Sequence, residues 1–383
     1  MLFRAPELDE RELSVLAEIE RLKHSLRLQL NEPRRWSGSL RRLSFARNIQ
    51  GSNSIEGYDA ALDDAAAVAL GEEPLDADEE TRLALEGYRD AMTYVLQLSN
   101  DEDFSYSDQL LKGLHFMMTS YSMRNRPGLW RTGAIYVQRE EDGVIVYEGA
   151  DVAEVPSLMR ELATVLNDEQ TDQPVVSGAM AHLNLVMIHP FKDGNGRMAR
   201  CLQSLVLARK GVLSPVFMSI EEYLGRNTQD YYNVLAEVGD GAWNPTNDAR
   251  PWLRFSLTAH LRQARTLLNR VRESERLWLE LDGLATKRGL PERSVNALYD
   301  AAFGMRVRNS TYRASFDDGP DEISDQTAST DLRRMVEAGL LQPHGERRGR
   351  YYLASPQLRD VMVTVRKERP IRDSSDPFAG SPR

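Results

Sequence analysis

The chain has 383 residues, more than one ordinary domain requires, and this length predicts two or three domains. Apolar residues make up 41% and charged residues 28%, a globular balance that excludes a disordered or membrane-spanning class. The net charge of −10 excludes a general attraction for nucleic acid, so such binding would need a local basic patch. Cys201 is the only cysteine, which excludes an internal disulfide and a cysteine-based zinc site.

The N-terminal segment indicates a cytoplasmic protein. Its residues MLFRAPELDEREL carry acids where a signal peptide would be apolar. Pure apolar runs such as 185–188 are far too short to span a bilayer. We therefore expect no membrane contact.

Most of the first 290 residues show apolar side chains at three- and four-residue spacing, which predicts helices. The clearest segments are 38–56, 78–98, 107–121, 154–167, 173–188 and 197–209. Ser107 is a short polar residue at the start of the third segment and suits a helix N-cap. The predicted fold class is mainly α.

Residues 52–57 read SNSIEG and close the first of these helices. Ser52 and Glu56 lie one helical turn apart and share a face, and Gly57 suits a helix end. From spacing alone, a solvated glutamate at a helix C-terminus is the simpler interpretation.

Residues 134–147, AIYVQREEDGVIVY, interrupt the helical pattern with two β-rich runs around Asp142 and Gly143. An Asp-Gly pair between such runs predicts a β-hairpin. Its apolar positions are Ile135, Tyr136, Val137, Val144, Ile145 and Val146. Among helices, the hairpin is either a structural flap or an edge that docks another chain.

The segment 189–200, HPFKDGNGRMAR, lies between two predicted helices and carries the most chemistry. Pro190 cannot continue the first helix, so His189 lies at its end and is the only ring base of the segment. Gly194-Asn195-Gly196 opens the next helix, where backbone N–H groups and the helix dipole favour an anion.

Two arginines and one acid complete this segment. Arg197 and Arg200 share a helix face and would bind phosphates in bidentate fashion. Asp193 adds a carboxylate, which together with substrate phosphates is a usual way to hold Mg²⁺. A surface helix–turn–helix would explain a lone GNG, but the twelve positions together predict phosphoryl or nucleotidyl transfer.

Residues 250–287 predict one long helix, which links the preceding region to a different C-terminal pattern. Helical patterns at 291–303 and 325–338 precede two strand-like runs around the basic turn 344–350. The segment from Thr327 to Arg334 resembles the recognition helix of winged helix-turn-helix domains. Because the charge of this region is near neutral, DNA binding through 325–350 and protein docking are about equally supported. A homodimer is also possible.

Residues 189–200 resemble the signature of the Fic family, HPFx(D/E)GNGRxxR, and meet every fixed position. The flanks also resemble the family: a helix with His182, the segment PGLWR at 127–131 before the hairpin, and Tyr231-Tyr232 downstream. The resemblance covers roughly 35 to 260 and implies a Fic-type helical bundle with a β-hairpin flap. The expected units are an N-terminal helical region 1–95, a catalytic core 96–250, a linking helix 251–289, a winged-helix-like domain 290–360 and a disordered tail 361–383.

The resemblance implies a protein adenylyltransferase that uses ATP as its substrate. His189 would deprotonate a Ser, Thr or Tyr hydroxyl of a target protein, which then attacks the α-phosphate. Asp193 would bind Mg²⁺, or Mn²⁺ in its place, and the hairpin would hold the target by main-chain pairing. The remaining site residues would bind ATP: Gly194, Asn195 and Gly196 as a phosphate cradle, Arg197 on the phosphate chain, Arg200 on the γ-phosphate and Tyr232 beside the base.

Residues 52–57 resemble the inhibitory motif of the same family, (S/T)xxxE(G/N). The likeness implies that Ser52, Glu56 and Gly57 form a brake on an inhibitory helix at about 38–57, with Glu56 paired to Arg200. Some family members use this glutamate to remove AMP, so the reverse reaction stays open.

Two other functions compete with AMP transfer. One is a DNA-binding transcriptional regulator that senses nucleotide through a Fic-like domain, in which His189 would have no obvious role. The other is transfer from UTP, GTP or CDP-choline, because the loop grips phosphates rather than bases.

Overall fold

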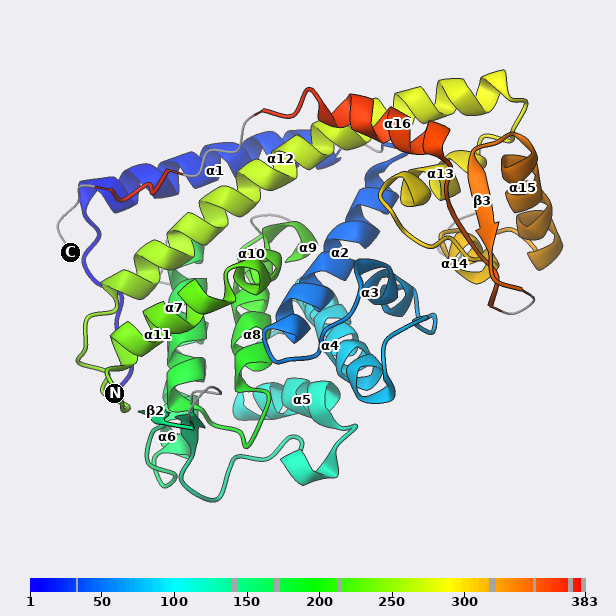
Figure 1. Ribbon diagram of the computed structural model, residues 1–383. Coiled ribbons are helices and arrows are strands. Elements are labelled where there is room, and N and C mark those ends of the chain that lie inside the picture. Colours follow the sequence, from blue (N-terminus) through cyan, green and yellow to red (C-terminus); the bar gives the residue numbers. More distant parts are fainter. Residues whose placement is uncertain are drawn as a thin grey trace.

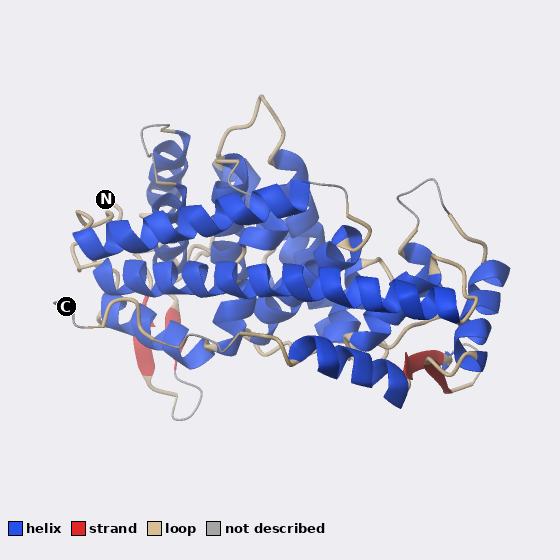
Figure 2. Cartoon of the chain, turned by 90° about the horizontal axis from the view of Figure 1, so that it is seen from above, coloured by secondary structure: helices blue, strands red, loops and turns tan. Residues whose placement is uncertain are grey.

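The computed structural model describes residues 1–31, 34–138, 143–168, 173–211, 215–316, 322–346, 349–370 and 375–379. These residues form mostly α-helices with two small antiparallel hairpins (Figure 2), which confirms the predicted mainly α fold class. No helix within these ranges combines the length and the apolar character that crossing a membrane requires.

The N-terminal third is helical. Its elements are α1 (Glu10–Asn31), α2 (Ser37–Ser54), α3 (Leu62–Ala69), α4 (Glu79–Leu98), α5 (Asp108–Thr119) and the short 3-10 helix η1 (Met123–Asn125). The predicted N-cap at Ser107 is confirmed, because its side chain accepts a hydrogen bond from the backbone N–H of Leu110.

The first hairpin follows η1 and consists of β1 (Tyr136–Gln138) and β2 (Ile145–Glu148), which pair antiparallel. Gly143 lies before β2 with a left-handed φ of 69°, which favours glycine, whereas Asp142 lies outside the described residues. The Glu148 end of β2 also pairs with the backbone of 241–243, so the hairpin is attached to the helical body along one edge.

The centre of the molecule is the helix pair α7 (Pro174–Ile188) and α8 (Asn195–Arg209), which lie side by side (Figure 1). Both helices are buried on nearly every face; α7 is mostly apolar, whereas α8 also buries polar side chains, among them Arg197 and Arg200. A buried apolar cluster surrounds them with side chains from α4, α5 and α6 (Val155–Asn167). The loop that joins α7 to α8 is therefore held between two fixed helix ends.

Shorter helices continue the body and lead into the longest one. They are α9 (Pro215–Met218), α10 (Glu221–Arg226), α11 (Thr228–Gly239) and α12 (Arg250–Lys287). The predicted long helix 250–287 is thus confirmed. Figure 1 shows α12 beside α1 along one face, where Arg254 pairs with Asp9 at 2.7 Å and with Glu12 at 2.9 Å.

The C-terminal region is α13 (Ser294–Ala302), α14 (Asn309–Ala314), α15 (Asp325–Glu337), the hairpin β3 (Leu341–His344) with β4 (Tyr351–Ala354), and α16 (Pro356–Arg366). Val307 forms an isolated bridge with Tyr352 and adds a third segment to this hairpin. The region shares one core with the second half of α12 and the first half of α2. It is therefore packed onto the N-terminal region rather than separated by a free linker.

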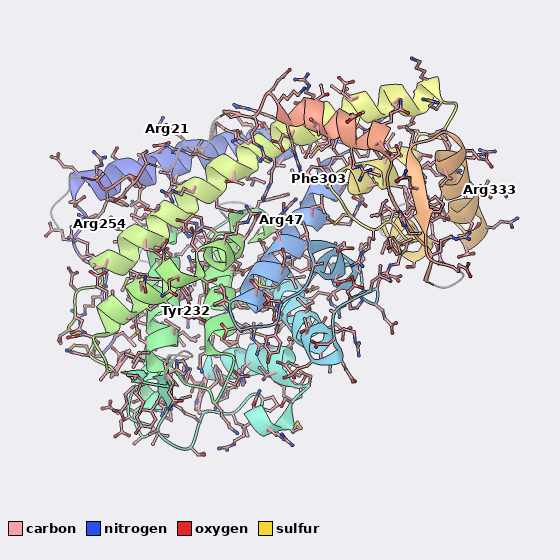
Figure 3. The ribbon with its side chains drawn as sticks, in the orientation of Figure 1. Arg21, Arg47, Tyr232, Arg254, Phe303 and Arg333 are labelled. Atoms are coloured by element: carbon pink, nitrogen blue, oxygen red, sulfur yellow. The ribbon has the colours of Figure 1, made fainter. Side chains whose placement is uncertain are left out.

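The charged side chains described in the C-terminal region give no further support to the hypothesis that it binds DNA. Arg333, which points outward from α15 (Figure 3), lies 3.9 Å from Glu337, and Arg293 pairs with Asp331 at 2.6 Å. Arg347 and Arg348, in the basic turn 344–350, lie outside the described residues.

The predicted disordered tail begins too early. Residues 361–366 continue α16, because Leu358, Met362 and Val365 recur at helical spacing and are buried. Phe378 is also buried, beneath the guanidinium of Arg254 at 5.4 Å. The chain therefore folds back onto α12 before its end.

Candidate active site

His189 ends α7 in a left-handed conformation with φ 55°, and Pro190 follows it. Such a backbone costs a residue other than glycine roughly 1–3 kcal/mol, so surrounding contacts must hold it. The Nδ1 atom of His189 lies 3.0 Å from the Val186 carbonyl oxygen, which can only accept, so Nδ1 carries the proton. Nε2 is then left as the acceptor that a general base needs.

Burial lowers the pKa of His189 below its ordinary value, against the Val186 carbonyl and the charge of Glu56, which raise it. The imidazole is therefore neutral at physiological pH. Its position at the end of α7 agrees with the role of proton acceptor that the sequence predicts.

The loop after His189 is closed by its own residues. The side chain of Asn195 accepts a hydrogen bond from the Phe191 N–H at 2.9 Å and donates one to the Phe191 carbonyl at 3.0 Å. Asn195 is buried, so only its backbone N–H is available to an anion. Phe191 is fully buried, as expected of a loop anchor.

His115 on α5 is a site residue that sequence reasoning missed. Its Nδ1 accepts from the Gly128 N–H at 2.9 Å, so its protonated Nε2 donates to the Asp193 carbonyl at 3.0 Å. Its ring stacks on Phe191 with centroids 3.7 Å apart, and burial lowers its pKa to about 4. A lone histidine in a helical pattern carries no sequence signal for this role.

The start of α8 forms the cradle that the two glycines predict. Gly194 has a φ of 76°. A Cβ at Gly196 would collide with Glu56 Oε1 and lie 3.0 Å from Arg200 Nη1. The space over this helix start thus holds a carboxylate group, where a negatively charged ligand is favoured.

Arg200 and the end of α2 form a buried cluster of polar contacts. The Arg200 guanidinium donates to Ser52 Oγ at 2.8 Å, to the Ser52 carbonyl at 2.8 Å and to Glu56 Oε1 at 2.7 Å. Burial raises the pKa of Glu56, but Arg200 and Arg197 outweigh it and hold that pKa below the usual range. The pairing that the sequence predicts between Glu56 and Arg200 is present in the structure.

Arg197 lies on the same face of α8 and is also buried. It donates to the Tyr121 hydroxyl at 3.3 Å and stacks over the Tyr58 ring at 5.1 Å. Among the described residues, Arg197 Nε and Arg200 Nη1 are buried donors without a hydrogen-bond partner. Unpaired buried guanidinium donors are costly and fit an anionic ligand.

Asp193 lies beside this cradle with 40% of its side chain exposed. It accepts from Asn125 Nδ2 at 2.7 Å and lies 3.6 Å from Arg197 Nη2. The described ranges contain no group of three His, Cys, Asp or Glu side chains that could hold a metal ion. A single carboxylate fits Mg²⁺ only in company with substrate phosphates, which is how this ion usually binds.

Tyr232 lies on α11 near the end of α2 (Figure 3). Its hydroxyl donates to the Ile55 carbonyl at 2.9 Å, and its side chain is half exposed. Gly57 has a φ of 83°, which agrees with its predicted place at the helix end. His182 is buried and hydrogen-bonded to Gln203 and Tyr231, so it is part of the core.

The hairpin alternates exposed and covered side chains. Tyr136 and Ile145 are about half exposed, Val144 and Gln138 are exposed, and Val137 and Val146 are partly covered. Ile135 also packs inward, against the position that a Cβ of Gly149 would take. The hairpin thus lies next to the His189 loop and presents apolar groups to solvent.

Residues 105–207 match the model of the Fic/DOC family. The chain is 31% identical over 160 residues to protein adenylyltransferase fic-1 of Caenorhabditis elegans. The match covers 41% of this chain and 28% of that protein. It is also 31% identical over 190 residues to protein adenylyltransferase Fic of Aedes aegypti. This match covers 46% of this chain and 34% of that protein. The matches therefore span about a third of these relatives or less.

Solved structures extend the likeness beyond this segment. A Fic family protein from Desulfovibrio desulfuricans G20 matches 92% of this chain and 99% of its own, with a TM-score of 0.59 and 20% identity. Fic-1 of Caenorhabditis elegans matches 67% of this chain and 72% of its own, with a TM-score of 0.51 and 24% identity. At these identities the likeness concerns the fold alone. The chain carries a Fic/DOC domain at residues 105–207, and its fold is that of Fic family structures.

Proposed function

We propose that the chain transfers AMP from ATP to a Ser, Thr or Tyr hydroxyl of a protein. The observation that carries the proposal is the loop 189–200, which brings a neutral base to a helix start lined by two buried arginines. Its relatives named protein adenylyltransferase support the choice of AMP as the transferred group.

Each residue of the loop has a role that its geometry supports. His189 accepts the proton of the target hydroxyl at Nε2, and the hydroxyl oxygen attacks the α-phosphate. The backbone N–H groups of 194–196 and the unpaired donors of Arg197 and Arg200 bind the phosphate oxygens. Asp193 would hold Mg²⁺ together with the phosphates, and the ion would neutralise phosphate charge. Pyrophosphate leaves as the protein–AMP bond forms.

The Glu56 carboxylate inhibits this reaction in our proposal. It occupies the side of the cradle where Arg200 would bind the γ-phosphate, and it is ionised beside the two arginines. A phosphate brought there would meet like charge and would lose the Arg200 contact. ATP then binds in a pose from which transfer is slow.

The hairpin supplies the surface for the target protein. Its base packs beside His189 through Ile135 and Gly149, Tyr136 and Ile145 are about half exposed, and an extended segment could add to strand β1. Main-chain pairing of this kind would fix the hydroxyl near His189 without strong selection for sequence.

A donor comparison tests the proposal against other nucleotides. The Glu56→Gly variant would be incubated with Mg²⁺, a cell lysate and ATP, GTP, UTP or CDP-choline, each labelled at the phosphate that would be transferred. Label is expected in protein bands with ATP. Label from another donor alone would replace AMP by that group, and ATP binding without any label would favour a nucleotide sensor.

The transfer rate is expected to depend on pH in one direction. His189 must be neutral to accept a proton, and burial holds its pKa below the ordinary value of about 6.5. Above that pKa the base is active, so the rate of the Glu56→Gly variant should be level near pH 7 and decline only at pH values below the ordinary pKa of histidine. Single-turnover rates at saturating ATP would measure this, with ATP affinity followed over the same range. A rate that halves above pH 7 would contradict the assignment.

A further inference from the structure

Arg131 connects the hairpin to His189. It lies between the PGLW turn and β1 and is almost fully buried. Its Nε donates to the His189 carbonyl at 2.8 Å, and its backbone N–H donates to the Pro190 carbonyl at 2.9 Å. Arg131 therefore holds the carbonyl groups of His189 and Pro190, the first through its side chain and the second through its backbone, where His189 has its left-handed conformation.

The other side of the guanidinium holds the base of the hairpin. Nη1 donates to the Gly133 carbonyl at 2.7 Å, before β1, and Nη2 donates to the Ala150 carbonyl, after β2. Among the residues that the structure describes, no carboxylate pairs with Arg131 within 4.0 Å. Its hydrogen bonds go to backbone carbonyls, including those that end α7, where a cation is favoured, and the charges of Asp151 and Glu148 also stabilise it.

Two further contacts join the same parts. The Tyr147 hydroxyl of β2 donates to the Met187 carbonyl at 2.8 Å, in the last turn of α7. A Cβ at Gly149 would lie 2.8 Å from Ile135 and 3.1 Å from His189 Cβ. The hairpin base thus packs on His189 without room for one methyl group.

The geometry points to Arg131 as a positioning residue that couples the hairpin to His189. A target segment docked on the hairpin, and the base that deprotonates its hydroxyl, are thereby held in a fixed position relative to each other. This inference rests on the proposed function, because it concerns the same base and the same docking surface. Arg131 touches no reacting atom and acts through the His189 backbone.

The test compares Arg131→Lys and Arg131→Gln in the Glu56→Gly background. Lysine keeps the charge but cannot span both groups of carbonyls, and glutamine loses the charge as well. Transfer is expected to fall in the order parent, Lys, Gln, by about 10²-fold for Gln, the loss that follows from a misplacement of about 1 Å. ATP affinity should not change, because the hydrogen bonds of Arg131 go to carbonyls at the hairpin base and the end of α7 rather than to the start of α8. Arg124→Gln, at an exposed arginine nearby, is the matched control and should transfer at the parent rate.

A second readout is independent of AMP transfer. The imidazole of His189 would be titrated by NMR in the parent and in both variants. The charged groups that act on it are Glu56, Arg131 and Asp193. Loss of the Arg131 charge is expected to raise the pKa of His189 in Arg131→Gln, and Arg131→Lys should restore most of the parent value.

Gly149→Ala provides a test that leaves Arg131 in place, should its variants fail to fold. The added methyl should separate the hairpin base from His189 and lower the transfer rate with ATP affinity retained. Parent-like transfer in both Arg131→Gln and Gly149→Ala, or an unshifted His189 titration in Arg131→Gln, would overturn the inference. A parent without transfer would instead contradict the proposed function, and the titration would still decide the role of Arg131.

Discussion

Replacing Glu56 by glycine is expected to raise the rate of AMP transfer by about 10- to 100-fold. The carboxylate forms a partly buried, charge-assisted hydrogen bond of 2.7 Å with Arg200 and lies against the Gly196 cradle. A bond of this kind is worth about 1.5–3 kcal/mol, which corresponds to this range of rates when ATP phosphate must displace it. Initial rates at fixed ATP, with ATP affinity measured separately, would check the prediction.

Glu56→Gln separates charge from bulk in the same experiment. It keeps the shape of the side chain but removes the negative charge, so its rate should lie between those of the wild type and Glu56→Gly. Equal rates in wild type and Glu56→Gly would refute the inhibitory role of Glu56.

Removing the proposed general base, His189, is the second change with a large expected effect on the transfer rate. Adding His189→Ala to Glu56→Gly is expected to lower transfer by about 10²- to 10⁴-fold, the usual contribution of a positioned general base. ATP should bind as before, because the phosphates contact the start of α8 and its arginines rather than the imidazole. Rates would be compared with ATP dissociation constants from calorimetry.

The control for this variant is His24→Ala, at an exposed histidine of α1. It should leave both transfer and ATP binding at the Glu56→Gly level. Transfer by the double variant at the rate of its parent would exclude His189 as the base and would favour a different proton acceptor.

The helical body could be predicted from the sequence because its signals are local. Apolar spacing located α2, α4, α5, α7 and α8 within a few residues, and the Gly-Asn-Gly segment marked the start of α8. The predicted pairing of Glu56 with Arg200, a contact between residues far apart in the chain, came from the resemblance of 52–57 to a family motif rather than from spacing.

The missed parts depend on contacts between distant segments. His115 and Arg131 bind backbone carbonyls of the His189 loop, and no periodicity marks a side chain for such a role. The backbone N–H of Asn195 is still expected at the phosphates, but the second role of its side chain, which closes the loop on Phe191, carried no sequence signal. The tail was expected to be disordered because its composition is polar, yet Phe378 finds a place on α12 that only the folded body creates.

The central claim is that the α-phosphate of ATP, with its adenosine, becomes attached to protein. The most direct measurement is to incubate the Glu56→Gly variant and a protein target with ATP labelled either at the α-phosphate or at the γ-phosphate. The account predicts stable protein label from the α-position alone, with the γ-label released as pyrophosphate. Label retained from the γ-position would show phosphoryl transfer and would contradict the account.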